Sequence, residues 1–452
     1  MAPFVLLLQP LLLISPSSSS QSAFSQWSPP RMPCLLRKRT LQWRASSEKG
    51  TKLITFVGKG GSGKTVSAIL AAQYYASNGL RTCLLIQSQD PTADVLLGVK
   101  LGSTPSSFRE GALTALRLET TKMLIEPLAQ IRKADARLNF SQGALDEVVG
   151  EELSVLPGMD SLLALGALER FADFVGGLFK RVGKTDDNKD YDVVVYDGLS
   201  SEEIFRMFGS AERARWYLSR FRSIAEKTDA GRVTLPSVLK LIEGAFLDEG
   251  KGTPRSTNEI WEAGDRILSR VVKTFQDPQR FSCFLVTNPC SQIAVDTALR
   301  YWGCAAQAGV YVAGALYPKL ATDTAPLAST IEEGFSPLRI SGIPFLSFES
   351  PPDWDEVIRR MSQQTKDILD GRSQAKPIPP PVSFDQSART VTLFLPGFNK
   401  SDVKLSQWRG GSELLVEAGD QRRSVVLPTA MRGKVSGAKF QENCLVVTVK
   451  PR

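Results

Sequence analysis

Histidine is absent from the 452-residue sequence. Without an imidazole the chain cannot use a Ser-His-Asp triad, a histidine general base or a histidine-ligated zinc site. Cysteine is sparse, and its six residues form no C-x-x-C pair, so no zinc knuckle or redox dithiol motif is readable. Sparse thiols fit a reducing compartment. Buried, inert cysteine is the favoured interpretation, and a redox role for Cys283, Cys290 and Cys304 stays open.

A strong basic surface is also missing outside the N-terminal segment. The formal net charge is +8, but residues 1–50 carry most of that excess and contain a single acid, Glu48. The remaining chain is close to neutral for its length, so no nucleic-acid partner is expected. With 42% apolar and 23% charged residues the composition is ordinary for a globular protein, and the length allows two or three domains.

Residues 1–47 have the composition of an organelle transit peptide, because they are rich in serine and arginine and poor in acids. The apolar run 4–14 competes as the core of a secretory signal. However, Pro10 interrupts it, no basic segment precedes it, and it is too short to span a bilayer. We therefore expect removal of residues 1–47 and residence in the chloroplast stroma, with secretion as the alternative.

The central motif of the chain is GKGGSGKT at residues 58–65. It follows an apolar run, 53–57, and precedes helix-forming residues at 66–78, which is the context of a phosphate-binding P-loop. Glycines let successive N–H groups point at phosphate oxygens, Lys64 reaches toward the β- and γ-phosphates, and the Thr65 hydroxyl can ligand Mg²⁺. The predicted nucleotide-binding residues are Gly58, Lys59, Gly60, Gly61, Ser62, Gly63, Lys64, Thr65 and Val66.

Two aspartates follow buried strands further along the chain: Asp90 comes after the strand signal at 81–87, and Asp197 ends the one at 191–197. The carboxyl ends of parallel strands form the ligand crevice of an α/β sheet, so both are expected near the phosphates. Asp90 can orient the attacking water, with a helix-cap or Asx-turn aspartate as the alternative. Asp197 fits a Walker-B pattern, with an ordinary strand-end aspartate as the alternative. The predicted Mg²⁺ residues are Thr65, Asp90 and Asp197.

Alternating strand and helix signals predict a doubly wound, mostly parallel sheet over residues 51–372. A last amphipathic helix is expected at 353–369, with Gly371 as its stop. Further strands are expected at 281–287, 310–315 and 340–348, with a helix at 295–307.

Apolar residues recur at helical spacing within 159–179, 207–221 and 235–247, which indicates helices inserted into a minimal P-loop sheet. Ordinary core packing explains most of them. A groove for a hydrophobic client is the alternative interpretation.

Prolines in the segment 373–382 indicate a stiff, extended linker. Beyond it, short strand signals separated by turns predict a small all-β sandwich over residues 383–452. Its expected strands lie at 390–395, 402–405, 413–417, 423–427 and 444–449.

The motifs GKGGSGKT, LLIQSQDPTAD (84–94) and YDVVVYD (191–197) together resemble the ArsA family, which includes arsenite-pump ATPases and the ATPase that guides tail-anchored membrane proteins. LPGMD (156–160) is similar to the Pro-Gly-x-Asp motif of that family. The resemblance implies that the chain is a homodimer that hydrolyses ATP to ADP and phosphate with Mg²⁺. It also implies that Lys59 is the intersubunit lysine of a deviant P-loop, and that Asp90, Lys59 and Lys64 are the catalytic residues.

The sequence departs from the family in both switches. At 90–94 it has Asp-Pro-Thr-Ala-Asp where family members usually have Asp-Pro-Ala-His-Asn, and the switch II run 197–206 has Asp-Gly-Leu-Ser-Ser-Glu-Glu-Ile-Phe-Arg in place of Asp-Thr-Ala-Pro-Thr-Gly-His-Thr-Leu-Arg. Communication between hydrolysis and the client site is therefore expected to differ. The C-x-x-C zinc clasp of the eukaryotic targeting ATPase is missing, so the dimer would be held otherwise. The adenine-contacting asparagine expected after the strand at 310 is not evident.

The C-terminal segment resembles a small heat-shock, or α-crystallin, domain in its runs FLPGF (394–398), LLVEAG (414–419), RSVVLP (423–428) and CLVVTV (444–449). With the N-terminal segment, this combination looks like a plastid-type member of the family. The resemblance implies a targeting factor or chaperone whose partners are hydrophobic segments of membrane proteins and a membrane receptor. The alternative is an ATP-dependent switch or scaffold in plastid metal handling or complex assembly.

Overall fold

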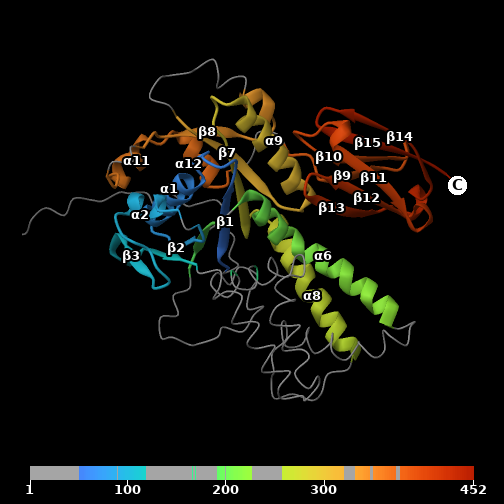
Figure 1. Cartoon of the computed structure of the whole chain (residues 1–452), viewed down its shortest axis with the longest axis horizontal. Coiled ribbons are helices and arrows are strands. Elements are labelled where there is room, and N and C mark those ends of the chain that lie inside the picture. Colours follow the sequence, from blue (N-terminus) through green and yellow to red (C-terminus); the bar gives the residue numbers. More distant parts are fainter. Residues whose placement is uncertain are drawn as a thin grey trace, which may run out of the picture. The chain divides into compact units, whose positions relative to one another are not determined.

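The computed structural model describes residues 50–88, 90–118, 165, 168, 191–198, 200–225, 257–319, 331–346, 350–372 and 377–451. An eight-stranded sheet in the order β3-β4-β2-β5-β1-β6-β7-β8 forms its first part (Figure 1). All neighbours pair in parallel except β3 and β4. The predicted doubly wound, mostly parallel α/β fold is therefore confirmed.

The strands of this sheet are β1 (Lys52–Val57), β2 (Thr82–Ile86), β3 (Ser106–Phe108), β4 (Leu113–Arg117), β5 (Val193–Asp197), β6 (Phe281–Val286), β7 (Val312–Pro318) and β8 (Ile340–Ile343). The helices beside it are α1 (Lys64–Ser77), α2 (Thr92–Leu97), α6 (Ser201–Ala225), α8 (Thr257–Gln276), α9 (Gln292–Gln307), α11 (Trp354–Arg360) and α12 (Gln363–Leu369). None of the helices in the described ranges is both long and apolar enough to cross a lipid bilayer.

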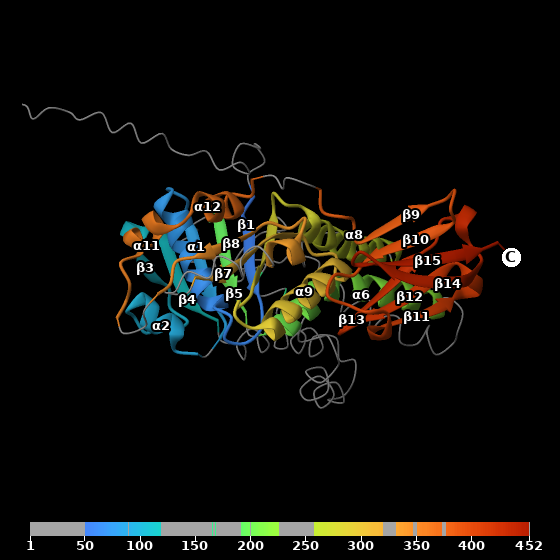
Figure 2. The same cartoon turned by 90° about the horizontal axis from the view of Figure 1, so that it is seen from above.

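Helices cover both faces of the sheet, with α1, α2, α11 and α12 on one side and α6, α8 and α9 on the other (Figure 2). Successive side chains of β1 enter different cores: Ile54 and Phe56 pack with α1, whereas Leu53 and Val57 pack with α6 and α9. A central strand buried on both faces reads as a continuous apolar run. This packing explains why the run before the P-loop shows no polar alternation.

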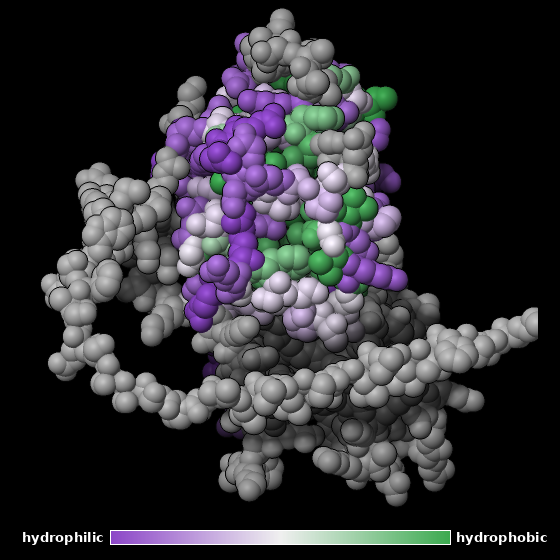
Figure 3. Space-filling model, turned by 90° about the vertical axis from the view of Figure 1, so that its left-hand side faces the viewer, coloured by the Kyte–Doolittle hydropathy of each residue, from purple (hydrophilic) through white to green (hydrophobic). Residues whose placement is uncertain are grey.

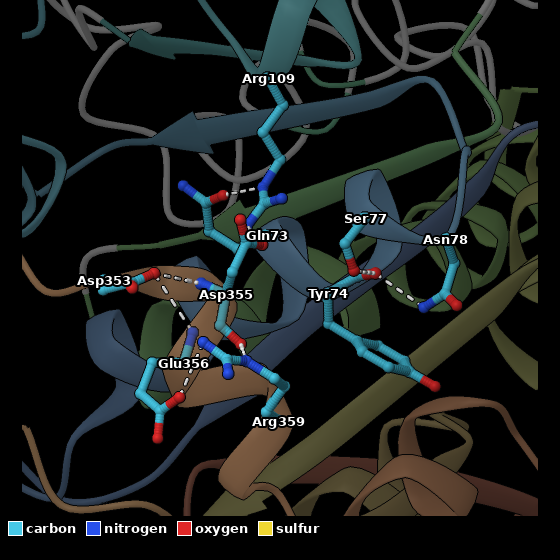
Figure 4. A network of polar contacts seen from close by, with 9 residues as sticks. All are labelled: Gln73, Tyr74, Ser77, Asn78, Arg109, Asp353, Asp355, Glu356 and Arg359. Atoms are coloured by element: carbon cyan, nitrogen blue, oxygen red, sulfur yellow. Dashed lines mark hydrogen bonds and ion pairs between the residues drawn. The ribbon is translucent and has the colours of Figure 1, made fainter. Parts of the chain in front are cut away.

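A polar network ties the edge of the sheet to two helices on the α1 side (Figure 4). Arg109, in the turn between β3 and β4, donates a hydrogen bond to Gln73 of α1 and lies 2.8 Å from the Asp355 carboxylate of α11. Asp353 caps α11 by accepting from the backbone N–H groups of Asp355 and Glu356. The surface at this end mixes hydrophilic and hydrophobic residues (Figure 3).

The second part of the described chain is an antiparallel all-β sandwich, as predicted. One sheet has the order β14-β15-β10-β9 and the other β11-β12-β13. Val391 and Leu393 of the first sheet and Leu414 and Val416 of the second are buried in the same core. The strands are β9 (Val382–Asp385), β10 (Thr390–Phe394), β11 (Val403–Trp408), β12 (Glu413–Ala418), β13 (Gln421–Val426), β14 (Lys434–Gln441) and β15 (Cys444–Lys450).

The sandwich packs directly on α9 and α6 (Figure 1). Trp302 of α9 meets Phe394 edge to face, with ring centroids 5.1 Å apart, and Gln307 donates a hydrogen bond of 2.9 Å to the Phe394 carbonyl. Arg300 pairs with Asp402 at 2.6 Å. The two parts therefore share one continuous core, although they differ in fold class.

Two expectations about elements need correction, and some elements were not expected. The single helix predicted at 353–369 is wrong, because Met361 has an extended backbone and the Ser362 hydroxyl caps a new helix, α12. Strand β9 begins at Val382, inside the predicted linker. Strand β4 and helix α8 were not predicted at all. The expected transit peptide, the motif at 156–160 and the helix at 235–247 lie outside the described residues, as does the 159–179 stripe except for Leu165 and Leu168.

Candidate nucleotide site

The loop between β1 and α1 has the geometry that a phosphate needs. Gly61 and Gly63 have φ of 78° and 94°, values that favour glycine, and Gly63 caps the N-terminus of α1. A Cβ added at Gly60, Gly61 or Gly63 would meet no atom within 4 Å. The loop thus borders open space at the positively polarised end of a 14-residue helix, where an anion binds favourably.

Gly58, the first glycine of the loop, is required for a different reason, because neighbouring atoms leave no room for a side chain. A Cβ at Gly58 would lie 2.1 Å from the Val286 carbonyl oxygen of β6, so only glycine fits there. Its N–H donates to the Ser201 hydroxyl at 2.8 Å, and its carbonyl accepts from that hydroxyl at 2.9 Å and from the Lys64 ammonium at 3.1 Å. Ser201 starts α6, so the loop is joined directly to the helix that follows Asp197. Sequence reasoning did not single out Ser201.

Asp197 lies at the carboxyl end of β5 with 1% of its surface exposed. The Thr65 hydroxyl hydrogen-bonds to its carboxylate, and its Oδ2 has no hydrogen-bond partner in the described part of the chain. Burial raises the pKa of Asp197 to about 6, and the Thr65 hydrogen bond and the charge of Lys64 oppose that rise. A buried carboxylate oxygen without a donor, beside a threonine hydroxyl, suits a hard cation with oxygen ligands such as Mg²⁺.

Lys64 and Asp197 influence each other across this pocket. Burial lowers the pKa of the Lys64 ammonium, while the negative charges of Asp197 and Glu202 oppose that shift. The Ser62 hydroxyl is buried, and it too lacks a hydrogen-bond partner among the residues that the structure describes. Phosphate oxygens would serve both the ammonium and the hydroxyl, so the residues present fit a Mg²⁺-nucleotide.

Asp90 lies at the surface of the same edge. Its Oδ1 accepts from the Thr92 backbone N–H at 2.7 Å and from the Thr92 hydroxyl. Hydrogen bonds from that hydroxyl and that N–H lower the pKa of Asp90. This is the Asx-turn arrangement that the sequence left open, and it puts Asp90 at the start of α2. Asp90 follows the carboxyl end of β2 and Asp197 ends the neighbouring strand β5, and the negative charge of Asp90 contributes to the raised pKa of Asp197.

The remaining predicted residues flank this pocket. Lys59 is exposed, and its carbonyl accepts from the Ser62 N–H at 3.0 Å. Val66 is partly buried against the core on the α1 side. Arg117, which sequence reasoning missed, ends β4 and donates to the carbonyl of Ser88 and to the carboxylate of Asp94. An arginine at the end of an apolar strand is the signal that could have indicated it.

Three of the five cysteines that the structure describes are buried. Cys83, Cys283 and Cys304 are buried free thiols, whereas Cys290 is exposed. Burial raises the pKa of Cys83 and Cys304 to about 12 each, which keeps both thiols protonated and unreactive near neutral pH. Within the described ranges, no group of three or more cysteine, aspartate or glutamate side chains could hold a metal ion.

Comparison with known proteins gives a consistent result. Residues 51–312 match the family model of the anion-transporting ATPase ArsA, and residues 386–449 match that of an HSP20-like domain found in ArsA proteins. A Chlorobaculum tepidum protein with the provisional name arsenical pump-driving ATPase is 23% identical, over 87% of this chain and 95% of its own length. An uncharacterised protein of Streptomyces coelicolor is 27% identical, over 89% of this chain and 97% of its own.

Proposed function

Because the chain belongs to the ArsA family of ATPases and carries that family's HSP20-like domain, we propose that it is a homodimeric ATPase that captures and releases hydrophobic segments of membrane proteins in the chloroplast stroma. The observation that carries the catalytic part of the proposal is the P-loop, where three glycines border open space at the start of α1, together with the Asp197 carboxylate oxygen that has no hydrogen-bond partner among the described residues.

Each residue of the pocket has a distinct part in this proposal. The N–H groups of the loop bind phosphate oxygens, and Lys64 exchanges the Gly58 carbonyl for a phosphate. Thr65 and Asp197 hold Mg²⁺, which when bound neutralises charge developing on the transferred phosphoryl group. Asp90 orients the attacking water once its carboxylate turns from Thr92. Lys59, exposed on the loop, is free to reach the nucleotide of a second copy.

Support for a hydrophobic client comes from the outer half of α6. Its inner half is core, with Phe205, Met207 and Phe208 buried, but Trp216 is 41% and Tyr217 62% exposed. The two rings meet edge to face at 5.2 Å, and the Arg220 guanidinium lies over Trp216. Large exposed aromatic side chains side by side are a contact surface for apolar chains.

The proposed ATP hydrolysis is tested by measuring phosphate release with a protein that comprises residues 48–452. We expect Mg²⁺-dependent release from ATP, loss of nucleotide binding in Lys64→Ala, and retained binding with at least about a hundredfold slower turnover in Asp90→Asn. Asp355→Asn, at an exposed aspartate in the Arg109 network, is the matched control and should leave the rate unchanged. Normal turnover in Asp90→Asn would remove that residue from the mechanism.

The client half is tested separately with a labelled peptide of about 20 apolar residues, the length of a membrane-spanning helix. Asp90→Asn with ATP should bind it, ADP should release it, and Trp216→Ala combined with Tyr217→Ala should weaken capture. Trp408→Ala removes an aromatic ring that is 52% exposed on the sandwich and serves as the control. An ATPase that binds no apolar peptide in either state would favour the switch or scaffold interpretation.

A further inference from the structure

Ser88 and residues 90–94, hereafter segment 88–94, lie between the end of β2 and α2 and include Asp90, so the position of that carboxylate depends on what holds these residues. Strand pairing places one side chain beside this segment. Ile86 of β2 lies opposite both Asp197 of β5 and Arg117 of β4. Arg117 and Asp197 therefore occupy the same row of the sheet, on either side of the strand from which the segment emerges.

The guanidinium of Arg117 contacts the segment at three points. Nη1 donates to the Ser88 carbonyl and, at 3.5 Å, to the Asp90 carbonyl, and Nη2 donates to Asp94 Oδ1 at 2.8 Å. These acceptors lie before, at and after Asp90. The side chain of Arg117 is only 9% exposed and that of Asp94 23%, so solvent screens the ion pair poorly.

Both partners of this ion pair are themselves fixed. The Arg117 N–H donates to the Gly102 carbonyl at 2.8 Å, and Asp94 Oδ1 also accepts from the Leu101 N–H at 3.0 Å. The planar guanidinium of Arg117 donates several hydrogen bonds in fixed directions and therefore fixes the orientation of segment 88–94. A lysine ammonium at this position would not fix these directions. The Asp90 side chain is exposed, and its Oδ1 accepts hydrogen bonds from the N–H and the hydroxyl of Thr92.

We propose that Arg117 is the positioning residue for Asp90: it holds segment 88–94 so that the Asp90 carboxylate stays in reach of the attacking water. The inference rests on the proposed ATP hydrolysis and adds to it the residue pair Arg117 and Asp94, which acts through Asp90 without touching the nucleotide. Displacing a catalytic group by about 1 Å can cost a hundredfold in rate.

The first test compares turnover with nucleotide affinity. Arg117→Met should lower kcat by on the order of tenfold to a hundredfold but change the affinity for ADP by less than about twofold, because the P-loop is intact. The kcat values of Arg117→Lys and Asp94→Asn should lie between those of Arg117→Met and the unmodified protein. Arg109→Met is the matched control, since it removes another arginine–aspartate pair from the same part of the fold. Should Arg117→Met fail to fold, the two milder variants carry the test.

The second test asks whether Arg117 acts through Asp90. Adding Arg117→Met to Asp90→Asn should slow turnover no further, whereas independent contributions would multiply. A multiplied loss, or an equal fall in kcat and nucleotide affinity, overturns the inference while leaving the ATPase in place. If the unmodified chain releases no phosphate from ATP, the proposed function itself fails, and the two failures are thereby distinguished.

Discussion

Glycine has opposite roles in the P-loop and in the contact between α9 and the C-terminal sandwich. At Gly60 and Gly61 an added Cβ would meet nothing within 4 Å, whereas at Gly303 of α9 it would lie 2.6 Å from the Pro396 carbonyl. At Gly397, on the sandwich side, it would lie 2.3 Å from a backbone nitrogen of α9. One set of glycines keeps a surface open for a ligand, and the other lets two parts of the same chain approach closely.

Carboxylates show the same difference. Asp402, in the contact with α9, pairs with Arg300 at 2.6 Å and accepts from the Asn399 N–H at 3.0 Å. Asp197, at the nucleotide site, is almost fully buried, and its Oδ2 has no donor in the described chain. A buried, unpaired carboxylate oxygen is costly, so its presence at one edge of the sheet indicates a site that a ligand completes.

The largest expected effect lies at the contact between α9 and the sandwich. Gly303→Val places a side chain against the Pro396 carbonyl, which can retreat only if the backbone moves, and against the ring of Phe398, which is buried. We expect the free energy of unfolding to fall by about 3 kcal/mol, the upper range for overpacking, measured by urea denaturation. Gly437→Val, at a glycine of β14 with open space, is the control. Equal stability of the two variants would mean that the sandwich is not held against α9 in solution.

The P-loop and the helix after it could be predicted from sequence because their signals are local. An apolar run, a glycine run and helix formers stand next to one another, and the observed β1 and α1 match the expected bounds within two residues. Ser201 and Arg117 could not be predicted in the same way. Their roles depend on the three-dimensional arrangement: Ser201 bonds to Gly58 across 143 positions, and strand register places Arg117 in the same row as Asp197.

The C-terminal region shows a second limit of sequence reasoning. Strand composition predicted the sandwich, but a sequence contains no direct sign that α9 and β10 share a core. The break at Met361 was missed for a different reason: apolar residues such as Val357 and Ile368 keep helical spacing on both sides of it. Only the Ser362 cap, a weak signal on its own, marks the new helix.

A smaller effect is expected at the amino end of β1, at the opposite end of that strand from the P-loop, where the side chain of Lys52 is buried. Burial lowers the pKa of Lys52 from 10.5 to about 7, and the charge of Asp277 opposes this. Between pH 7 and 10.5 the unfolded chain therefore binds more protons at this lysine than the folded chain does. The free energy of unfolding should rise with pH in that window, by about 1 kcal/mol per pH unit.

The measurement is urea denaturation at pH 7, 8 and 9 for the unmodified chain and for Lys52→Met. Methionine is about as long as lysine but has no titratable group. The free energy of unfolding of Lys52→Met should therefore depend much less on pH in this range. Lys404→Met, at an exposed lysine of the sandwich, should leave the slope unchanged. If the free energy of unfolding of Lys52→Met rose with pH as steeply as that of the unmodified chain, other groups would cause the rise. Lys52 would then be hydrated in the folded protein.

The smallest effect on stability is expected at Gly60, and there the difference between the two kinds of glycine becomes measurable. Its φ is not in the left-handed region and no atom lies within 4 Å of an added Cβ, so Gly60→Ala should change the free energy of unfolding by less than about 0.5 kcal/mol. The same methyl group enters the space from which loop N–H groups reach a phosphate, so ATP should bind more weakly. Isothermal titration with ATP alongside urea denaturation separates the two quantities. Gly303→Val should produce the reverse pattern, with lost stability and unchanged affinity for ATP in the protein that remains folded. If both variants lost both stability and affinity, the P-loop and the contact between α9 and the sandwich would be energetically coupled.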